Sequence, residues 1–168
     1  SLIPGGKGAN QAFALGKLGA SVSMIGAVGN DEYGRQLINN LKLADVNTKK
    51  IVKMEDIHTG NAFINVDKQG ENSIVVVSGA NSKITKEFID KNICYIKNSK
   101  VIVMQLEIPI EVVCYVAKVA KELGKIVVLD PAPARENLPA ELFQYVDIMK
   151  PNETELHTLS GVELKSED

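Results

Sequence analysis

Apolar and polar residues follow two different periods along this 168-residue chain. Short apolar or β-branched runs, typical of buried strands, alternate with segments whose apolar residues recur every three or four positions, as in amphipathic helices. The expected strands are 21–28, 101–106, 125–129 and 146–150, and the expected helices begin near Gly8, Asp31, Thr85, Pro109 and Asn152. Strands that alternate with helices indicate a parallel sheet, covered on both faces and joined by right-handed crossovers.

Residues 59–78 interrupt this alternation. Two strand-like segments, 59–67 and 73–78, flank a loop with a glycine and amide side chains, which predicts an antiparallel hairpin. Such a hairpin is either an ordinary sheet edge or a flap over a site. Small and apolar residues alternate at Ala62 and Ile64, so one face of the hairpin could cover a ligand.

The segment 4–12, PGGKGANQA, places three glycines, a lysine and an amide at the start of the first helix. Free backbone amides and the positive end of the helix dipole favour oxygen-rich or anionic ligands there. The alternative is that the glycines only make a tight turn. A position of Lys7 and Asn10 on the buried side favours the ligand.

This segment does not match either of two common nucleotide-binding motifs. A phosphate-cradling loop of the Gly-x-x-x-x-Gly-Lys-Ser/Thr type needs a hydroxyl after its lysine, whereas Lys7 is followed by Gly8. A dinucleotide fingerprint needs a third glycine and a complete preceding strand, and only three residues precede Pro4.

Polar side chains follow the strands of the second half. Glu107 and Asp130 each come directly after a predicted strand, at the end where open α/β sheets bind ligands. Asn152 and Glu155 form an Asn-x-x-Glu pattern close to a capping box, which helix stability alone would explain. Asp31 is interpreted in the same way, as a helix cap.

The composition favours a small-molecule partner. Nineteen basic and 21 acidic residues are spread along the chain without a basic cluster, which argues against nucleic acid and anionic membrane surfaces. Cys94 and Cys114 are isolated, so we expect reduced thiols in apolar surroundings and a cytoplasmic protein. No apolar run approaches the ~20 residues that span a bilayer. The chain begins without methionine, which leaves open whether a targeting segment precedes Ser1.

With these motifs in place, the chain resembles the PfkB family of carbohydrate kinases. Residues 5–12 (GGKGANQA) and 26–34 (GAVGNDEYG) resemble the first family signature, and QLE, DPAPAR and KPNETE follow in the family's order at 105–107, 130–135 and 150–155. The resemblance implies a Rossmann-like α/β sandwich with a mainly parallel central sheet and a small β-sheet lid. Residues 1–168 would form one partial domain, with the lid at about 59–78.

The resemblance also implies an activity, the ATP-dependent phosphorylation of D-ribose at its 5-hydroxyl. Gly6, Lys7 and Asn10 would hydrogen-bond sugar hydroxyls, and Glu107 would accept another from the far side of the same cavity. Ala62 and Ile64 would belong to the lid that closes over the sugar and excludes water.

The phosphate side is implied in the same way. Asn152 would lie near the ATP phosphates and Glu155 near Mg²⁺, while the intact enzyme would also use a monovalent cation, K⁺. The family's lid often pairs edge to edge, which suggests a homodimer through the hairpin.

The chain departs from the family pattern in one important respect. The family's catalytic aspartate lies in a Gly-Ala-Gly-Asp segment, which does not occur up to Asp168. We therefore expect the base beyond Asp168, together with the monovalent-cation site, and we expect most adenine contacts and an early Asn-x-Asp sugar contact outside the chain. The chain would be a fragment without the first strand and the C-terminal third, and inactive by itself.

Two other functions stay open. The parent could be another kinase of the family, acting on fructose, 2-keto-3-deoxygluconate or a nucleoside. The isolated chain could also be a sugar-binding module without chemistry.

Overall fold

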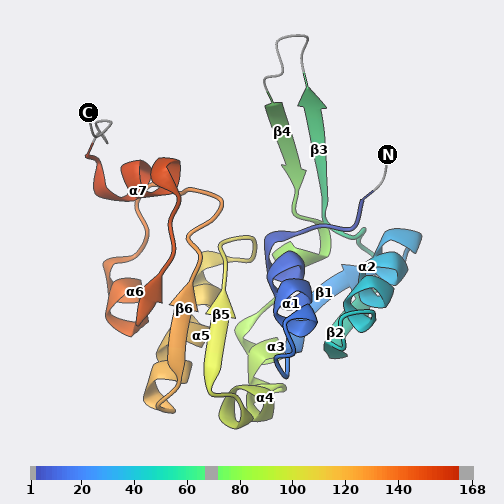
Figure 1. Ribbon diagram of the computed structural model, residues 1–168, viewed down its shortest axis with the longest axis horizontal. Helices are drawn as coiled ribbons and strands as arrows, with labels where there is room; N and C mark the ends of the chain where they lie inside the picture. Colours follow the sequence, from blue (N-terminus) through green and yellow to red (C-terminus); the bar gives the residue numbers. More distant parts are fainter. Residues whose placement is uncertain (1–2, 67–71, 163–168) are drawn as a thin grey trace. The chain divides into compact units, whose positions relative to one another are not determined.

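The computed structural model describes residues 3–66 and 72–162, with side chains for residues 3–63 and 75–162 (Figure 1). The chain forms two compact units, Ser1–Ile84 and Thr85–Asp168. Each unit contains parallel strands connected by helices, which confirms the α/β class expected from the sequence. The hydrogen bonds between parallel strands join them in two groups, one in each unit.

The first unit contains one parallel and one antiparallel strand pair. Its elements are α1 (Lys7–Lys17), β1 (Ser23–Gly29), α2 (Glu32–Lys42), β2 (Asn47–Met54), β3 (Asn61–Val66), β4 (Asn72–Val77) and the 3₁₀ helix η1 (Gly79–Lys83). β1 pairs with β2 in parallel, and β3 pairs with β4 in the expected hairpin. The sequence interpretation did not include β2, because its polar and lysine-rich residues lack the apolar run of a buried strand.

The core of the first unit packs α1 against the end of α2 and the start of β2. Ala12, Leu41, Ala44 and Val46 are buried together. Gly16 allows this close approach, because a Cβ at that position would lie 2.0 Å from the Ala44 carbonyl oxygen.

The second unit is a three-stranded parallel sheet with helices. Its elements are α3 (Lys86–Asp90), α4 (Ile93–Asn98), β5 (Val101–Met104), α5 (Ile110–Glu122), β6 (Ile126–Leu129), α6 (Ala140–Tyr145), β7 (Ile148–Met149) and α7 (Glu153–Ser160). The strand order is β5-β6-β7. Thr85 and Asn152 cap their helices as predicted, and Pro109 precedes α5. The short helices α4 and α6 were not predicted.

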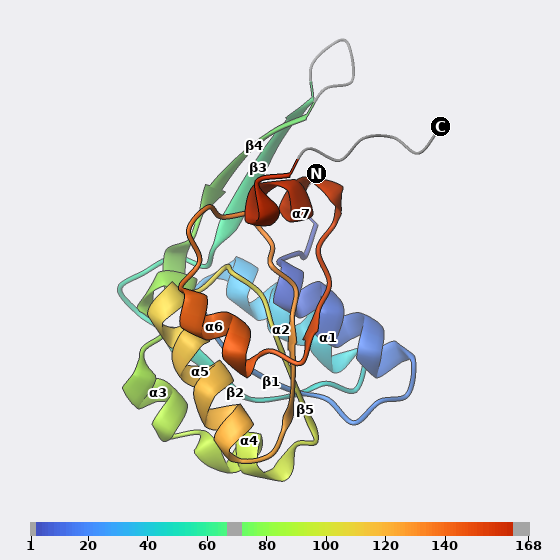
Figure 2. The same ribbon diagram turned by 90° about the vertical axis from the view of Figure 1, so that its left-hand side faces the viewer.

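The core of the second unit lies on one face of this sheet. α5 contacts β6 and α6, and the two helices lie side by side in Figure 2. Met104, Val127 and Leu129 are buried, whereas the alternate residues Val101 and Ile126 are 44% and 47% exposed. Within this unit, the face that carries Val101 and Ile126 is therefore less covered than the face that carries Val127 and Leu129, because successive side chains of a strand point to opposite faces.

No helix among residues 3–66 and 72–162 is both long and apolar enough to cross a membrane.

Asp147 joins the start of β7 to β6. Its backbone amide donates to the Val127 carbonyl at 2.9 Å, and its carboxylate accepts from the Val127 amide at 2.9 Å and from the Lys121 ammonium. The hydrogen bonds from Lys121 and Val127 lower the pKa of the Asp147 carboxyl. A lowered pKa stabilises the folded state above the pKa of the unfolded carboxyl, and this contribution disappears as pH falls through the folded value.

We therefore expect Asp147→Asn to lower the urea midpoint of this chain at pH 7. The difference from the parent sequence should shrink as pH falls below about 4, the ordinary pKa of an aspartate. Asp56→Asn, at an exposed position between β2 and β3, is the matched control and should leave the urea midpoint unchanged at both pH 7 and pH 3. An Asp147→Asn effect of the same size at pH 7 and pH 3 would contradict this account.

Candidate functional site

The glycine-rich turn begins α1 without a side-chain cap. Gly6 is the N-cap residue, with φ of 96°, and no acidic side chain lies in the first turn of the helix. The first helical hydrogen bond runs from the Asn10 amide to the Gly6 carbonyl, at 2.9 Å. No carboxylate of the first turn therefore neutralises the positive end of the α1 dipole.

The positions of the two polar side chains in this turn differ from the prediction in part. Lys7 is half-buried, but Asn10 is exposed rather than on the buried side. Asn10 lies on the first turn of α1 and outside the face that packs on the core. Its assignment as a sugar contact thus depends on the family resemblance rather than on burial.

The hairpin stands at the same end of the first unit as the start of α1, as Figures 1 and 2 show. Ala62 pairs with Val76 across the hairpin and is exposed, so it is available to cover a ligand. Ile64 pairs with Ile74 in the backbone register, and its side chain lies outside the described residues.

Asp31 caps α2 as predicted, accepting from the Gly34 amide at 2.8 Å. It also accepts two hydrogen bonds from Thr59, at the base of the hairpin. No pattern in the sequence indicates this second role, because the two residues are 28 positions apart and a single threonine before a strand is common.

The carboxyl ends of β5, β6 and β7 carry the candidate residues of the second unit. The Asp130 amide donates to the Met104 carbonyl at 2.9 Å, and the Lys150 amide donates to the Leu129 carbonyl at 3.0 Å. These bonds continue the ladder of the sheet beyond the strands. Glu107 and Asp130 thus follow adjacent parallel strands at one edge, as expected, and the segment that leads to Asn152 follows the third strand.

The loop after β6 holds the residue that precedes Glu107. Leu106 is fully buried, its amide donates to the Ala132 carbonyl at 2.9 Å, and its carbonyl accepts from Arg135 Nη2 at 2.8 Å. Both backbone groups of Leu106 are therefore bonded to one loop, which fixes the backbone from which Glu107 projects. Arg135 belongs to the DPAPAR segment, and no sequence pattern indicates its bond to Leu106.

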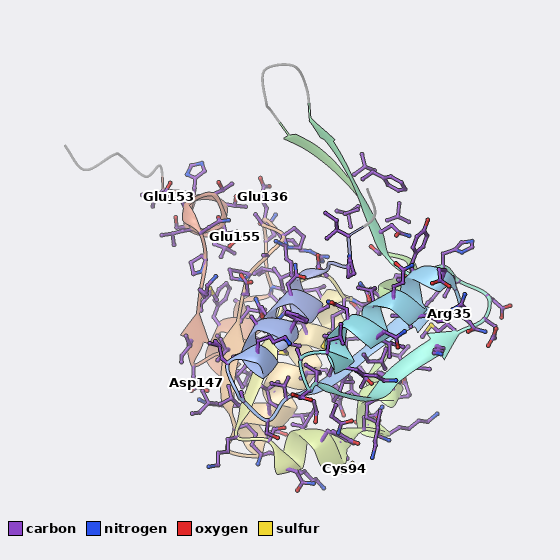
Figure 3. The ribbon with its side chains drawn as sticks, turned by 45° about the vertical axis from the view of Figure 1, so that its right-hand side comes forward. Arg35, Cys94, Glu136, Asp147, Glu153 and Glu155 are labelled. Carbon is purple, nitrogen blue, oxygen red and sulfur yellow. The ribbon has the colours of Figure 1, made fainter. Side chains whose placement is uncertain are left out.

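Asn152 and Glu155 form a complete capping box at the start of α7. Asn152 Oδ1 accepts from the Glu155 amide, and Glu155 Oε2 accepts from the Asn152 amide, both at 2.8 Å. Glu155 is only 6% exposed. Figure 3 shows Glu155 and Glu153 on α7, at the opposite end of the second unit from Cys94. Within the described ranges, no three His, Cys, Asp or Glu side chains cluster as ligands of a protein-built metal centre.

The two cysteines differ in their surroundings. Both are free thiols, but Cys94 is exposed and only Cys114 is buried, so the prediction of apolar surroundings is correct for Cys114 alone. Burial and the nearby Glu141 carboxylate raise the pKa of the Cys114 thiol, which makes it less reactive.

Comparison with known proteins supplies the family. The model of the pfkB family carbohydrate kinases matches residues 1–168. The chain belongs to this family. Because the match runs through every segment on which the resemblance was based, the order of motifs along the chain is the family's order.

Ribokinases are among the most similar relatives. The chain is 44% identical over 163 residues to the ribokinase of Haemophilus influenzae, covering 97% of this chain and 53% of that protein. It is also 44% identical to a bifunctional ribokinase/ribose-5-phosphate isomerase A of Fructilactobacillus sanfranciscensis, with 97% and 30% covered. The structure of Arabidopsis thaliana ribokinase complexed with ribose and ATP matches with a TM-score of 0.88 at 33% identity, over 96% of this chain and 53% of that chain.

These comparisons confirm the fold class and the family resemblance. The chain spans about half the length of the Haemophilus influenzae ribokinase and 30% of the length of the bifunctional relative. Asn10 belongs to the first unit and Glu107 to the second, so a common cavity for the two stays a prediction. That residues 1–168 form one partial domain also stays a prediction.

Proposed function

We propose that the full-length protein is a cytoplasmic, ATP-dependent sugar kinase that phosphorylates D-ribose at its 5-hydroxyl. The observation that supports this most directly is the 44% identity to ribokinase along nearly the whole of the chain. The structure is compatible with it, because candidate sugar and phosphate residues occur at a helix N-terminus and at the carboxyl edge of a parallel sheet.

The sugar would be bound by complementary donors and acceptors. Gly6, Lys7 and Asn10 supply an amide turn, an ammonium and a carboxamide, while Glu107 supplies a carboxylate acceptor. A pentose has hydroxyls that both donate and accept, so such a mixed set can satisfy it in a small polar pocket. The backbone of Glu107 is well suited to this role, since Leu106 before it is fixed by Ala132 and Arg135.

The nucleotide would be held at the start of α7. Asn152 is exposed, and Glu155 uses one oxygen to bond the Asn152 amide, so its carboxylate retains acceptor capacity for a Mg²⁺ ion or a metal-bound water. Magnesium usually combines one or two carboxylates with substrate phosphates, so the residues fit without a larger protein-built cluster. Bound Mg²⁺ would neutralise charge on the transferred phosphoryl group. A K⁺ site would belong to the intact enzyme beyond this chain.

The full-length protein would also be a homodimer through its hairpin. Phe63 and Val75 pair across one face and are 60% and 54% exposed, while Val76 on the other face is 58% exposed. A two-stranded sheet with apolar residues exposed on both faces is marginal in water without further cover. A second copy would supply that cover and pair an open strand edge.

The substrate is tested by comparing sugars. We expect the full-length protein to phosphorylate ribose with a kcat/KM at least tenfold above that for fructose, 2-keto-3-deoxygluconate and adenosine, in a coupled ADP assay. Glu107→Gln should raise the KM for ribose more than it changes that for ATP. The 168-residue chain should bind ribose in calorimetry without turnover, as a sugar-binding module would. No preference for ribose would refute the substrate, and kinase activity of the short chain would refute the position of the base.

The role of Glu155 is tested by Glu155→Gln. A glutamine can also complete a capping box, so thermal stability should stay within a few degrees while the Mg²⁺ concentration for half-maximal activity rises at least fivefold. Glu153→Gln, which removes a charge from an exposed residue of the same first turn, is the matched control and should leave the Mg²⁺ dependence unchanged. A change in stability with an unaltered Mg²⁺ dependence would leave Glu155 with the capping role only.

The dimer is tested by light scattering on the full-length protein. Phe63→Lys should halve the measured mass, because it places a charge on the exposed apolar face of the hairpin. Leu43→Lys, at a 70% exposed position after α2, is the matched control and should leave the mass unchanged. A dimer that survives Phe63→Lys would exclude this face as the interface.

A further inference from the structure

The base of the hairpin, residues 58–60 and 78–80, is bonded to the turn between β1 and α2. Thr59, which is 2% exposed, donates its amide to Asp31 Oδ2 at 2.8 Å and its hydroxyl to Asp31 Oδ1 at 2.6 Å. The same hydroxyl accepts from the Gly29 amide at 2.9 Å. The end of β1, the start of α2 and the first leg of the hairpin thus meet at one carboxylate and one hydroxyl.

The carboxylate is held in its charged form by these contacts. Burial raises the pKa of the Asp31 carboxyl, but hydrogen bonds from the Thr59 hydroxyl, the Thr59 amide and the Gly34 amide outweigh it, and the pKa falls below its ordinary value. Hydrogen bonds to a charged acceptor are stronger than neutral ones. The geometry at this point is therefore well defined, with three donors directed at one side chain.

The second leg of the hairpin lies against the first, backbone to backbone. The Ala80 amide donates to the His58 carbonyl at 2.9 Å. Gly79 has φ of +49°, and a Cβ there would lie 2.4 Å from the His58 oxygen, while a Cβ on Gly60 would lie 2.8 Å from the Ser78 oxygen. No larger residue fits either position without moving the backbone, so the two legs are in contact just before β3 and just after β4.

Above this base, the described side chains of the hairpin do not pack into the first unit. Ala62, Phe63, Val75, Val76 and Val77 are all exposed. The direction in which the hairpin leaves the unit is therefore set at its base. Asp31 and Thr59 provide side-chain hydrogen bonds between the base and the rest of the unit, and the 3₁₀ helix η1, which follows the second leg, packs against β1.

We propose that Asp31, acting through Thr59, is a positioning residue that sets the angle of the hairpin and thereby its ability to cover the sugar. This inference rests on the proposed function for its effect on catalysis. Asp31 then has a second role besides capping α2. Its hydrogen bond with Gly34 stabilises the start of α2, whereas its two hydrogen bonds with Thr59 hold the base of the hairpin. Neither residue contacts substrate in this account.

Variants can separate the two roles of Asp31. Asp31→Ser keeps a favoured N-cap for α2, but its shorter side chain cannot bond Thr59 as well. Thr59→Val keeps the shape of Thr59 and removes its hydroxyl, which leaves the buried Gly29 amide without this acceptor, and Thr59→Ser restores the hydroxyl. Thr85→Ala removes the cap of α3, in the other unit, and controls for a general loss of stability.

The test uses the full-length protein and two readouts. We expect Asp31→Ser and Thr59→Val to raise the KM for ribose at least tenfold, with kcat within threefold and the KM for ATP within twofold. Thr59→Ser should behave like the parent sequence. Thr85→Ala should lower the melting temperature and leave the KM for ribose unchanged. If Asp31→Ser and Thr59→Val change only the melting temperature, the proposal is wrong.

The second readout does not depend on the substrate. Spin labels at Lys42→Cys and Val77→Cys report the distance between α2 and the hairpin. Cys94 and any other exposed cysteine of the full-length protein are replaced by serine, and the labelled protein is diluted with unlabelled protein. The distance distribution should shift or broaden in Asp31→Ser and Thr59→Val but not in Thr59→Ser or Thr85→Ala. Identical distributions in all variants would overturn the proposal. A full-length protein without ribokinase activity would instead refute the proposed function, and the distances would still decide this inference.

Discussion

Parallel pairing of strands is the constraint on which the candidate residues of this chain depend. In a parallel pair the carboxyl ends of neighbouring strands meet at one edge, and each connection has to cross back through a helix. β5, β6 and β7 therefore place the segments that carry Glu107, Asp130 and Asn152 at one edge of a single sheet. In the first unit, β1 and β2 place Asp31 and Thr59 at one edge in the same way.

Hydrogen bonds that continue past the strands fix the backbone positions at this edge of the sheet. The amides of Asp130 and Lys150 extend the ladder, and the loop after β6 binds both backbone groups of Leu106. Except for the bond from the Arg135 side chain, these bonds join main-chain atoms, so they fix the position of the backbone without specifying the side chain that it carries. A family can then change substrates by exchanging residues at the edge while the sheet stays the same.

Helix caps in this chain combine stability with position. The side chains of Asn152 and Glu155 accept hydrogen bonds from each other's backbone amides, and the Asp31 carboxylate accepts hydrogen bonds from both Gly34 and Thr59. Asp31 accepts from two backbone amides, and Asn152 and Glu155 accept from one each. Such bonds restrict a side chain, which is useful for a group that must orient a phosphate or a lid. The capping role and the proposed functional role are therefore compatible, and the presence of one is no argument against the other.

The sequence by itself determined the local elements and the family. The helix starts at Asp31, Thr85, Pro109 and Asn152 were predictable because caps and prolines act within a few residues. The hairpin was predictable because its alternating pattern and its glycine-containing loop are adjacent in the chain. The motifs in residues 5–12 and 26–34 indicated the family because their order along the chain is specific in combination.

Only the tertiary structure decided which distant segments meet. β2 was missed because its lysines and polar residues give no apolar run, although it pairs with β1 in register. Asn10 is exposed, although burial was expected. The link between Asp31 and Thr59 spans 28 positions. A periodic pattern shows which face of an element is apolar, but what packs against that face depends on contacts between residues far apart in the chain, and these form only when the chain folds.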